Sequence, residues 1–131
     1  MWEMEPLEGY KRRCKHWPKK YRRELIAVHD NLDTFFKALR SGQTPAQAKF
    51  GFIHPESLGA LAIDPKGGGP HLKETRLYIY PDEKRQRLYV ITLGDKDTQT
   101  EDIKACKPIV QALWKEDVPE ASREERAHVQ Q

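Results

Sequence analysis

Apolar residues recur at steps of three and four from Trp17 to Leu39, which predicts an amphipathic helix with one buried face. Two basic residues fall in its last turn, and Gly42 can adopt the left-handed conformation that ends many helices. Asp30 or Asn31 can also cap a second helix. The pattern therefore leaves both a single helix and a helical hairpin open for this segment.

The second half of the chain shows the patterns of strands and a final helix. Residues 74–80 and 87–93 are rich in β-branched and aromatic side chains and flank a polar turn, which predicts a β-hairpin. Residues 58–63 form a short apolar run and are expected to be another strand. Helical spacing returns over residues 98–115, where Pro108 is expected to kink the helix or mark a new start.

These elements predict an α+β fold: a small antiparallel sheet with a mixed edge, an N-terminal helix or helical hairpin on one face, and a C-terminal helix. We expect both helical segments to cover the same face. Residues 9–17 contain no helix start signal and are expected to form a short basic edge strand. The length suits one domain, residues 1–115, followed by a polar and frayed tail, residues 116–131.

Charge is distributed unevenly along the chain. Residues 1–8 carry a net charge of −3, residues 9–23 carry +8 and residues 24–131 carry −2. A positive block of this density repels itself, and a polyanion relieves that repulsion. The sequence therefore favours a nucleic-acid or ribosomal surface as partner, and a solvated helix face that keeps the protein soluble is the alternative.

The sequence lacks the spacings that are typical of metal and cofactor sites. Cys14 and Cys106 form no C-x-x-C pair, and the histidines form no H-x-x-x-H pair. The glycines at 67–69 lack the spacing of a phosphate-binding loop. We therefore expect no metal and no cofactor, and both cysteines are expected to pack as small hydrophobic side chains.

No apolar run approaches the roughly 20 residues that a membrane crossing requires. The N-terminal residues lack the basic and apolar regions of a secretory signal. We therefore expect a cytoplasmic protein that does not bind a membrane.

Three segments match the sequence pattern of one known family. Residues 74–80, ETRLYIY, match an arginine-led strand of the form G-G-Y-R-V-I-Y-Y, and residues 90–103, VITLGDKDTQTEDI, match L-L-T-I-Y-S-K-x-x-Q-x-D-I. Residues 11–25, KRRCKHWPKKYRREL, match the opening F-K-R-x-x-K-K-L-x-K-K-Y. On these segments the chain resembles the RelE/ParE family of toxins from type II toxin–antitoxin systems. Two departures stand out: Gly94 replaces a family tyrosine, and residues 74–75 replace two glycines.

This resemblance implies a concave sheet that holds RNA against a basic surface, cleavage of mRNA in the ribosomal A site, and a cognate antitoxin that covers the surface. Arg76 matches the family arginine, whose guanidinium grips phosphate oxygens. Lys96 matches the family lysine and is expected to supply a second charge. For Arg76 the alternative is an exposed strand residue that pairs with Glu74 or Glu101.

Metal-free RNA cleavage also requires an acid and a base. His71 and His54 are candidates, because histidine exchanges protons readily near neutral pH. Tyr78 shares a face with Arg76 and is expected to stack on a base or bind a phosphate, with core packing as the alternative. The basic residues expected to hold the RNA backbone are Lys11, Arg12, Arg13, Lys15, Lys19, Lys20 and Lys73.

We therefore expect a toxin that acts as a ribosome-dependent endoribonuclease. The first alternative is a non-catalytic ParE-like or degenerate member that binds gyrase, or its own antitoxin and operator, which Gly94 favours. The second alternative is an RNA-binding module without toxicity, for which the basic block alone suffices.

Overall fold

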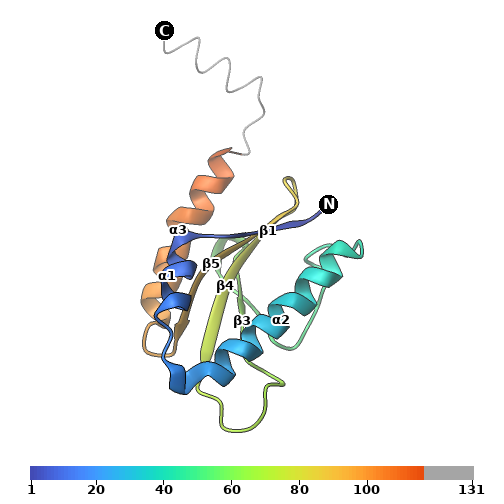
Figure 1. The fold of residues 1–131 in the computed structure, drawn as a ribbon. Coiled ribbons are helices and arrows are strands. Elements are labelled where there is room, and N and C mark those ends of the chain that lie inside the picture. Colours follow the sequence, from blue (N-terminus) through green and yellow to red (C-terminus); the bar gives the residue numbers. More distant parts are fainter. Residues whose placement is uncertain (117–131) are drawn as a thin grey trace, which may run out of the picture.

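The protein, described here by a computed structural model over residues 1–116, has three α-helices and a five-stranded sheet (Figure 1). Two short 3-10 segments, η1 and η2, complete the described elements. In chain order the elements are β1 (Glu3–Pro6), α1 (Glu8–Lys15), η1 (Lys19–Tyr21), α2 (Arg22–Arg40), β2 (Ile53–Pro55), η2 (Ser57–Gly59), β3 (Leu61–Ile63), β4 (Thr75–Asp82), β5 (Arg87–Asp95) and α3 (Gln99–Glu116).

The sheet has the strand order β1-β5-β4-β3-β2. β1 runs parallel to β5, and the other neighbouring strands are antiparallel. The predicted hairpin is present as β4 and β5, with Leu77 opposite Leu93. The predicted α+β class, with a mixed-edge sheet, N-terminal helices and a C-terminal helix, is therefore confirmed.

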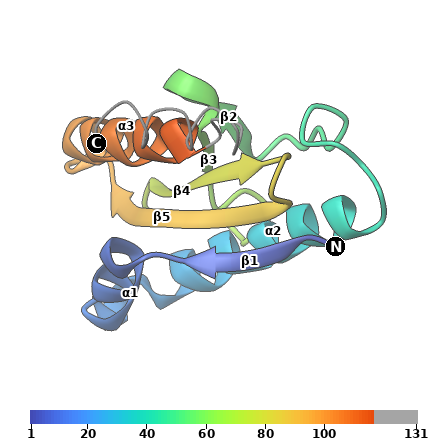
Figure 2. The same ribbon diagram turned by 90° about the horizontal axis from the view of Figure 1, so that it is seen from above.

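The two long helices cover opposite faces of the sheet, as Figure 2 shows. Successive side chains of a strand point to opposite faces. Leu77 and Ile79 of β4 pack with the apolar stripe of α2, whereas Tyr78 packs with Cys106 and Val110 of α3. The expectation that both helices share one face is wrong, because β4 and β5 are apolar on both faces and each face needs its own cover.

Residues 8–15 form the helix α1, so the expected edge strand over residues 9–17 is wrong. Glu8 lies in the first turn, and three basic residues lie in the last turn. This arrangement matches the dipole of a helix, whose N-terminal end favours anions and whose C-terminal end favours cations. The edge position is taken by β1, which pairs with β5.

α2 is one continuous helix, which decides between the single helix and the hairpin. Its buried stripe includes Val28, Leu32, Phe35 and Leu39. Gly42 follows the helix with φ of +105°, the left-handed conformation expected there.

Other elements differ from the expected ones in length. The strand expected at 58–63 is limited to β3, because η2 occupies residues 57–59 and Leu58 has φ of +63°. β2, only three residues long, was not predicted. α3 continues through Pro108 as a single helix and does not restart there. Glu116, the first residue of the tail expected over residues 116–131, ends α3, and the rest of that tail lies outside the described residues.

In the described part of the chain, no helix is both long enough and apolar enough to cross a membrane.

Candidate functional site

Three strands of the sheet bring a histidine, a carboxylate and an arginine together. His54 lies on β2, Asp64 directly follows β3, and Arg76 lies near the start of β4. In the register of the sheet, His54 lies opposite Ala62 of β3, and Ala62 lies opposite Tyr78 of β4. Because alternate residues of a strand share a face, this register places the three side chains on the α3 face at one end of the sheet.

Contacts join these three side chains around one carboxylate. His54 Nε2–H donates a hydrogen bond of 2.6 Å to Asp64 Oδ2. Arg76 Nη1 lies 3.9 Å from the same oxygen, and Arg76 Nη2 donates to Glu74 Oε1 at 3.2 Å. The Arg76 side chain is 17% exposed and that of His54 is 41% exposed, so both remain within reach of a ligand. We call His54, Asp64 and Arg76 the His–Asp–Arg cluster.

An open hollow of about 430 Å³ adjoins the cluster. Asp64 and Arg76 line it from the sheet, and Lys66, Gly69 and Leu72 line it from the loop between β3 and β4. A volume of this size suits part of a flexible polymer or a small ligand. The hollow therefore gives a substrate access to the guanidinium of Arg76.

Side chains of α2 hold the loop that carries the hollow. Asn31 Nδ2 donates to the carbonyl of Asp64 at 2.8 Å. Near the start of the same helix, Arg23 Nη2 donates to the carbonyl of Pro70 at 3.1 Å. These contacts fix the backbone at Asp64, and Arg23 connects the hollow to the basic residues that precede it in the chain.

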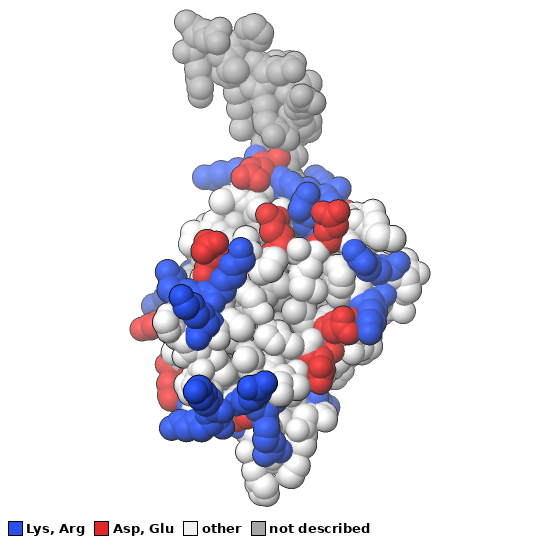
Figure 3. Space-filling model, in the orientation of Figure 1, with Lys and Arg blue, Asp and Glu red and all other residues white. Residues whose placement is uncertain are grey.

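Exposed Lys and Arg side chains gather over α1, η1 and the beginning of α2, toward the lower left of Figure 3. Glu8 forms an ion pair with Lys11 at 3.5 Å, an exposed contact of little energetic weight. We call the following exposed residues the basic surface: Lys11, Arg12, Lys15, Lys19, Lys20, Arg22 and Arg23.

Arg13, expected to hold the RNA backbone, makes its contacts within the fold. Its Nη1 donates to the carbonyl of Leu93 at 3.1 Å, and its Nη2 donates to Asp102 Oδ1 at 3.2 Å. Asp102 is almost fully buried. Burial raises the pKa of the Asp102 carboxyl, although the hydrogen bond from Thr98 and the charge of Arg13 act in the opposite direction. Arg13 therefore links α1 to the beginning of α3.

Lys73, also expected to hold RNA, pairs with Asp95. Its Nζ lies 3.1 Å from Asp95 Oδ2 and 4.4 Å from the ring centroid of Tyr21. Burial opposes ionisation of Asp95, but hydrogen bonds from Lys73 and from backbone amides outweigh it and lower the pKa of this carboxyl. The charge of Lys73 is thus largely balanced by a neighbouring anion.

Lys96 and His71 lie exposed at the same end of the sheet as the cluster. Lys96 follows β5, and His71 lies in the loop before β4 with φ of +58°. Among the described contacts, none joins either side chain to Arg76. Both stay candidates that a bound substrate can reach.

Tyr78 is buried beneath α3, with 1% of its surface exposed. Its hydroxyl has no hydrogen-bond partner among the described residues, and burial raises the pKa of the phenol well above its ordinary range. A side chain in this position packs the core and reaches a substrate only if α3 moves away.

Sequence reasoning missed Asp64 and Asn31 as parts of the site. In the sequence, Asp64 only follows the apolar run 58–63 and precedes a proline, which ends a strand, and Asn31 is only a residue that can cap a helix. The available signal was the position of Asn31 three residues after Val28 in the apolar stripe, because a partly buried amide needs hydrogen-bond partners.

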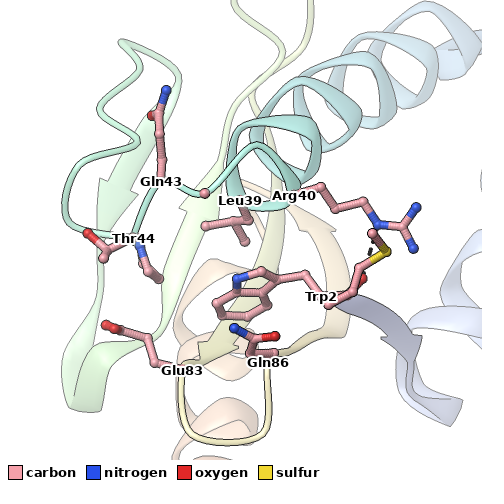
Figure 4. Close-up of a pocket in the computed structure, with 10 residues that line it drawn as sticks. Trp2, Leu39, Arg40, Gln43, Thr44, Glu83 and Gln86 are labelled. Carbon is pink, nitrogen blue, oxygen red and sulfur yellow. Dashed lines mark hydrogen bonds between the residues drawn. The ribbon is translucent and has the colours of Figure 1, made fainter.

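A second cavity, of about 260 Å³, lies at the opposite end of β4 (Figure 4). Trp2, Leu39 and Gln86 line it, together with one acid, Glu83, and one cation, Arg40. Arg40 donates its Nε–H to the carbonyl of Trp2. The lining offers no pair of groups suited to proton transfer, so we do not assign the active site here.

Across residues 1–116, no group of three or more His, Cys, Asp and Glu side chains is placed to hold a metal ion. Comparison with known proteins found no matching family model, no matching curated protein and no matching solved structure.

Proposed function

We propose that this protein is a cytoplasmic toxin of the RelE/ParE class that cleaves mRNA in the ribosomal A site. The observation that carries the proposal is the His–Asp–Arg cluster, which lies beside an open hollow next to the basic surface. His54 of β2 and Arg76 of β4 both face one carboxylate oxygen of Asp64, the residue that follows β3.

The cluster supplies two of the functions that metal-free RNA cleavage requires. His54, oriented by Asp64, accepts the proton of the attacking 2′-hydroxyl, as a histidine held by a carboxylate does in other acid–base sites. Arg76 stabilises the negative charge that develops on the phosphorane. His71 donates a proton to the 5′-oxygen as it leaves. Lys96 supplies a second positive charge near the phosphate.

The ion pairs of Arg76 leave room for a phosphate. A guanidinium has five N–H donors, and only one of them is engaged in a hydrogen bond with Glu74. The side chain of Glu74 is 41% exposed, so its ion pair with Arg76 is weak and can be displaced by a dianionic transition state.

The basic surface supports RNA as the partner. Seven exposed cations lie within 13 residues, from Lys11 to Arg23. Each cation that engages a phosphate releases counterions, so affinity falls steeply with salt. We propose that ribosomal RNA docks here and that a cognate antitoxin covers the same surface.

One observation favours a second candidate, a non-catalytic member of the class that binds gyrase or another protein target. Gly94 occupies the position of the family tyrosine, and Asp102 fills the space that a side chain there would need. The site therefore lacks one group that the resemblance implies.

Induced expression in a bacterial host, followed by primer extension on a reporter mRNA, separates the two candidates. We expect growth arrest with cuts in translated messages, and the same cuts are expected to be absent with Arg76→Ala. Growth arrest with intact messages and blocked replication would contradict RNA cleavage and favour gyrase.

The docking role has its own test. Replacing Lys11, Arg12 and Lys15 by Gln removes three exposed cations and leaves Arg13 in place. The slope of log affinity for ribosomes against log salt should flatten by about two to three units. An unchanged slope would exclude the basic surface from docking.

A further inference from the structure

A groove of about 320 Å³ lies between the end of α1 and the first turns of α2, inside the basic surface. Trp17, Leu25 and Ile26 give it apolar walls, and Lys19 and Arg22 line it as cations. Ile26 is 49% exposed and lies outside the buried stripe of α2, so its apolar surface is open to a ligand in the groove. The groove thus combines an apolar interior with a cationic rim.

The indole of Trp17 is held in a fixed orientation. Its Nε1–H donates to the carbonyl of Tyr21 at 3.0 Å, across the turn that joins α1 to α2. Trp17 remains partly exposed and lines the groove. An aromatic ring that is already oriented loses little conformational entropy when a second ring stacks on it.

The interior of the groove carries no balancing negative charge. His29 lines it, and its Nε2 lies 2.6 Å from the hydroxyl of Tyr10. Burial lowers the pKa of His29, although the charge of Asp30 acts in the opposite direction, so the fold favours the neutral imidazole. No acidic side chain lines the groove among the described residues.

We propose that this groove takes one unpaired base of the RNA, stacked on Trp17, with the flanking phosphates held by Lys19 and Arg22. The volume is at the small end of ligand sites, as a single base requires. A base offers an apolar π face and its phosphates offer negative charge, which complements the neutral interior and the cationic rim. This inference rests on the proposed function, because it takes RNA as the ligand. It places a base-binding subsite away from the cleavage site.

The test uses the full chain labelled with ¹⁵N, in which three tryptophans give three indole signals. Adenosine 5′-monophosphate is expected to shift the Trp17 signal in a saturable manner, and inorganic phosphate is expected to shift it much less. Trp114 is the internal control, because its indole is 44% exposed and donates to Tyr80 far from the groove. Equal shifts of Trp17 and Trp114, or none, would overturn the proposal.

A short single-stranded RNA and the same strand with abasic residues measure the contribution of the base. We expect the intact strand to bind roughly 5- to 150-fold more tightly, the range for stacking of one base on an aromatic ring. Ile26→Glu, at an exposed position, should abolish this difference, whereas Lys37→Gln, which changes the charge of the same helix by one unit elsewhere, should preserve it. Equal affinity of both strands for the wild-type protein would overturn the proposal.

Binding is measured here without cleavage, so the two proposals fail separately. Base-dependent binding in the groove together with uncut messages would contradict the cleavage function and support the base-binding subsite. If the protein cleaves messages but binds intact and abasic strands equally, the result would contradict the subsite and support the cleavage function.

Discussion

Asp102 lies so close to Gly94 that a Cβ atom at position 94 would fall 1.8 Å from Asp102 Oδ2. The same Cβ would lie 2.4 Å from Thr98 Oγ1. Thr98 donates to Asp102 Oδ2 at 2.7 Å, and Asp95 caps this turn by accepting from the Thr98 amide. The beginning of α3 is thus packed directly on β5, which requires glycine where the family pattern has tyrosine.

Gly94→Ala is therefore expected to destabilise the protein by about 1–3 kcal/mol, because a well-packed site must move to admit the methyl group. Urea unfolding followed by circular dichroism measures the change. Gly51→Ala is a suitable control, because its added Cβ would meet only the flexible end of Lys66. If both variants are equally stable, Asp102 does not pack on Gly94 as described.

Arg13→Ala should cost about 2 kcal/mol of unfolding free energy, since it leaves the buried carboxylate of Asp102 without its cation. Arg12→Ala removes the neighbouring exposed arginine and should change stability by less than about 0.5 kcal/mol. Comparing the two in chemical denaturation separates a structural cation from a surface cation. Equal effects would contradict the distinction.

Tyr78→Phe should leave stability unchanged or raise it by up to about 1 kcal/mol, because the hydroxyl that it removes is buried without a partner. The rate of RNA cleavage should also be retained, since the phenol packs beneath α3. Thermal unfolding and a cleavage assay on the same preparation check both points. A large loss of rate would show that Tyr78 acts on the substrate.

His29 should make the stability depend on pH. Burial lowers the pKa of His29 in the folded state, so below the ordinary value of 6.5 the unfolded chain binds more protons than the folded one. Stability from this group is present above that value and is lost as the pH falls through the lowered folded pKa. Urea midpoints at about pH 7.5 and about pH 5.5 measure the loss.

His29→Gln should reduce this loss on acidification, and His16→Gln controls for the removal of one exposed imidazole. The same pH dependence in His29→Gln as in the wild-type protein would contradict the assignment.

The sequence was informative where a pattern extends over many residues. The apolar stripe of α2 and the β-branched and aromatic content of β4 and β5 reflect burial in the core, and all three elements were predicted from them. α1 was missed because its eight residues include no buried position, so no apolar period marks it. Its helical state depends on charges placed along the dipole and on the contact of Arg13 with α3.

The site was only partly predictable for a similar reason. Arg76 and His54 could be named from residue type and resemblance, but their proximity depends on the pairing of β2, β3 and β4. β2 and β3 are three residues long, too short for a periodic signal. Asp64, which joins the two side chains, became visible only once the register was known.

The initial rate of cleavage of ribosome-bound mRNA by purified Arg76→Ala tests the central claim most directly. Arg87→Ala is the matched control, because Arg87 lies on the adjacent strand and, among residues 1–116, forms its ion pairs with Glu3 and Glu5, away from the cluster. Loss of one preorganised contact to the transition state predicts a rate for Arg76→Ala roughly a hundredfold below that of the wild-type protein and of the control. A rate within about twofold of the wild-type protein would contradict a role for Arg76, and with it the assignment of the His–Asp–Arg cluster as the cleavage site.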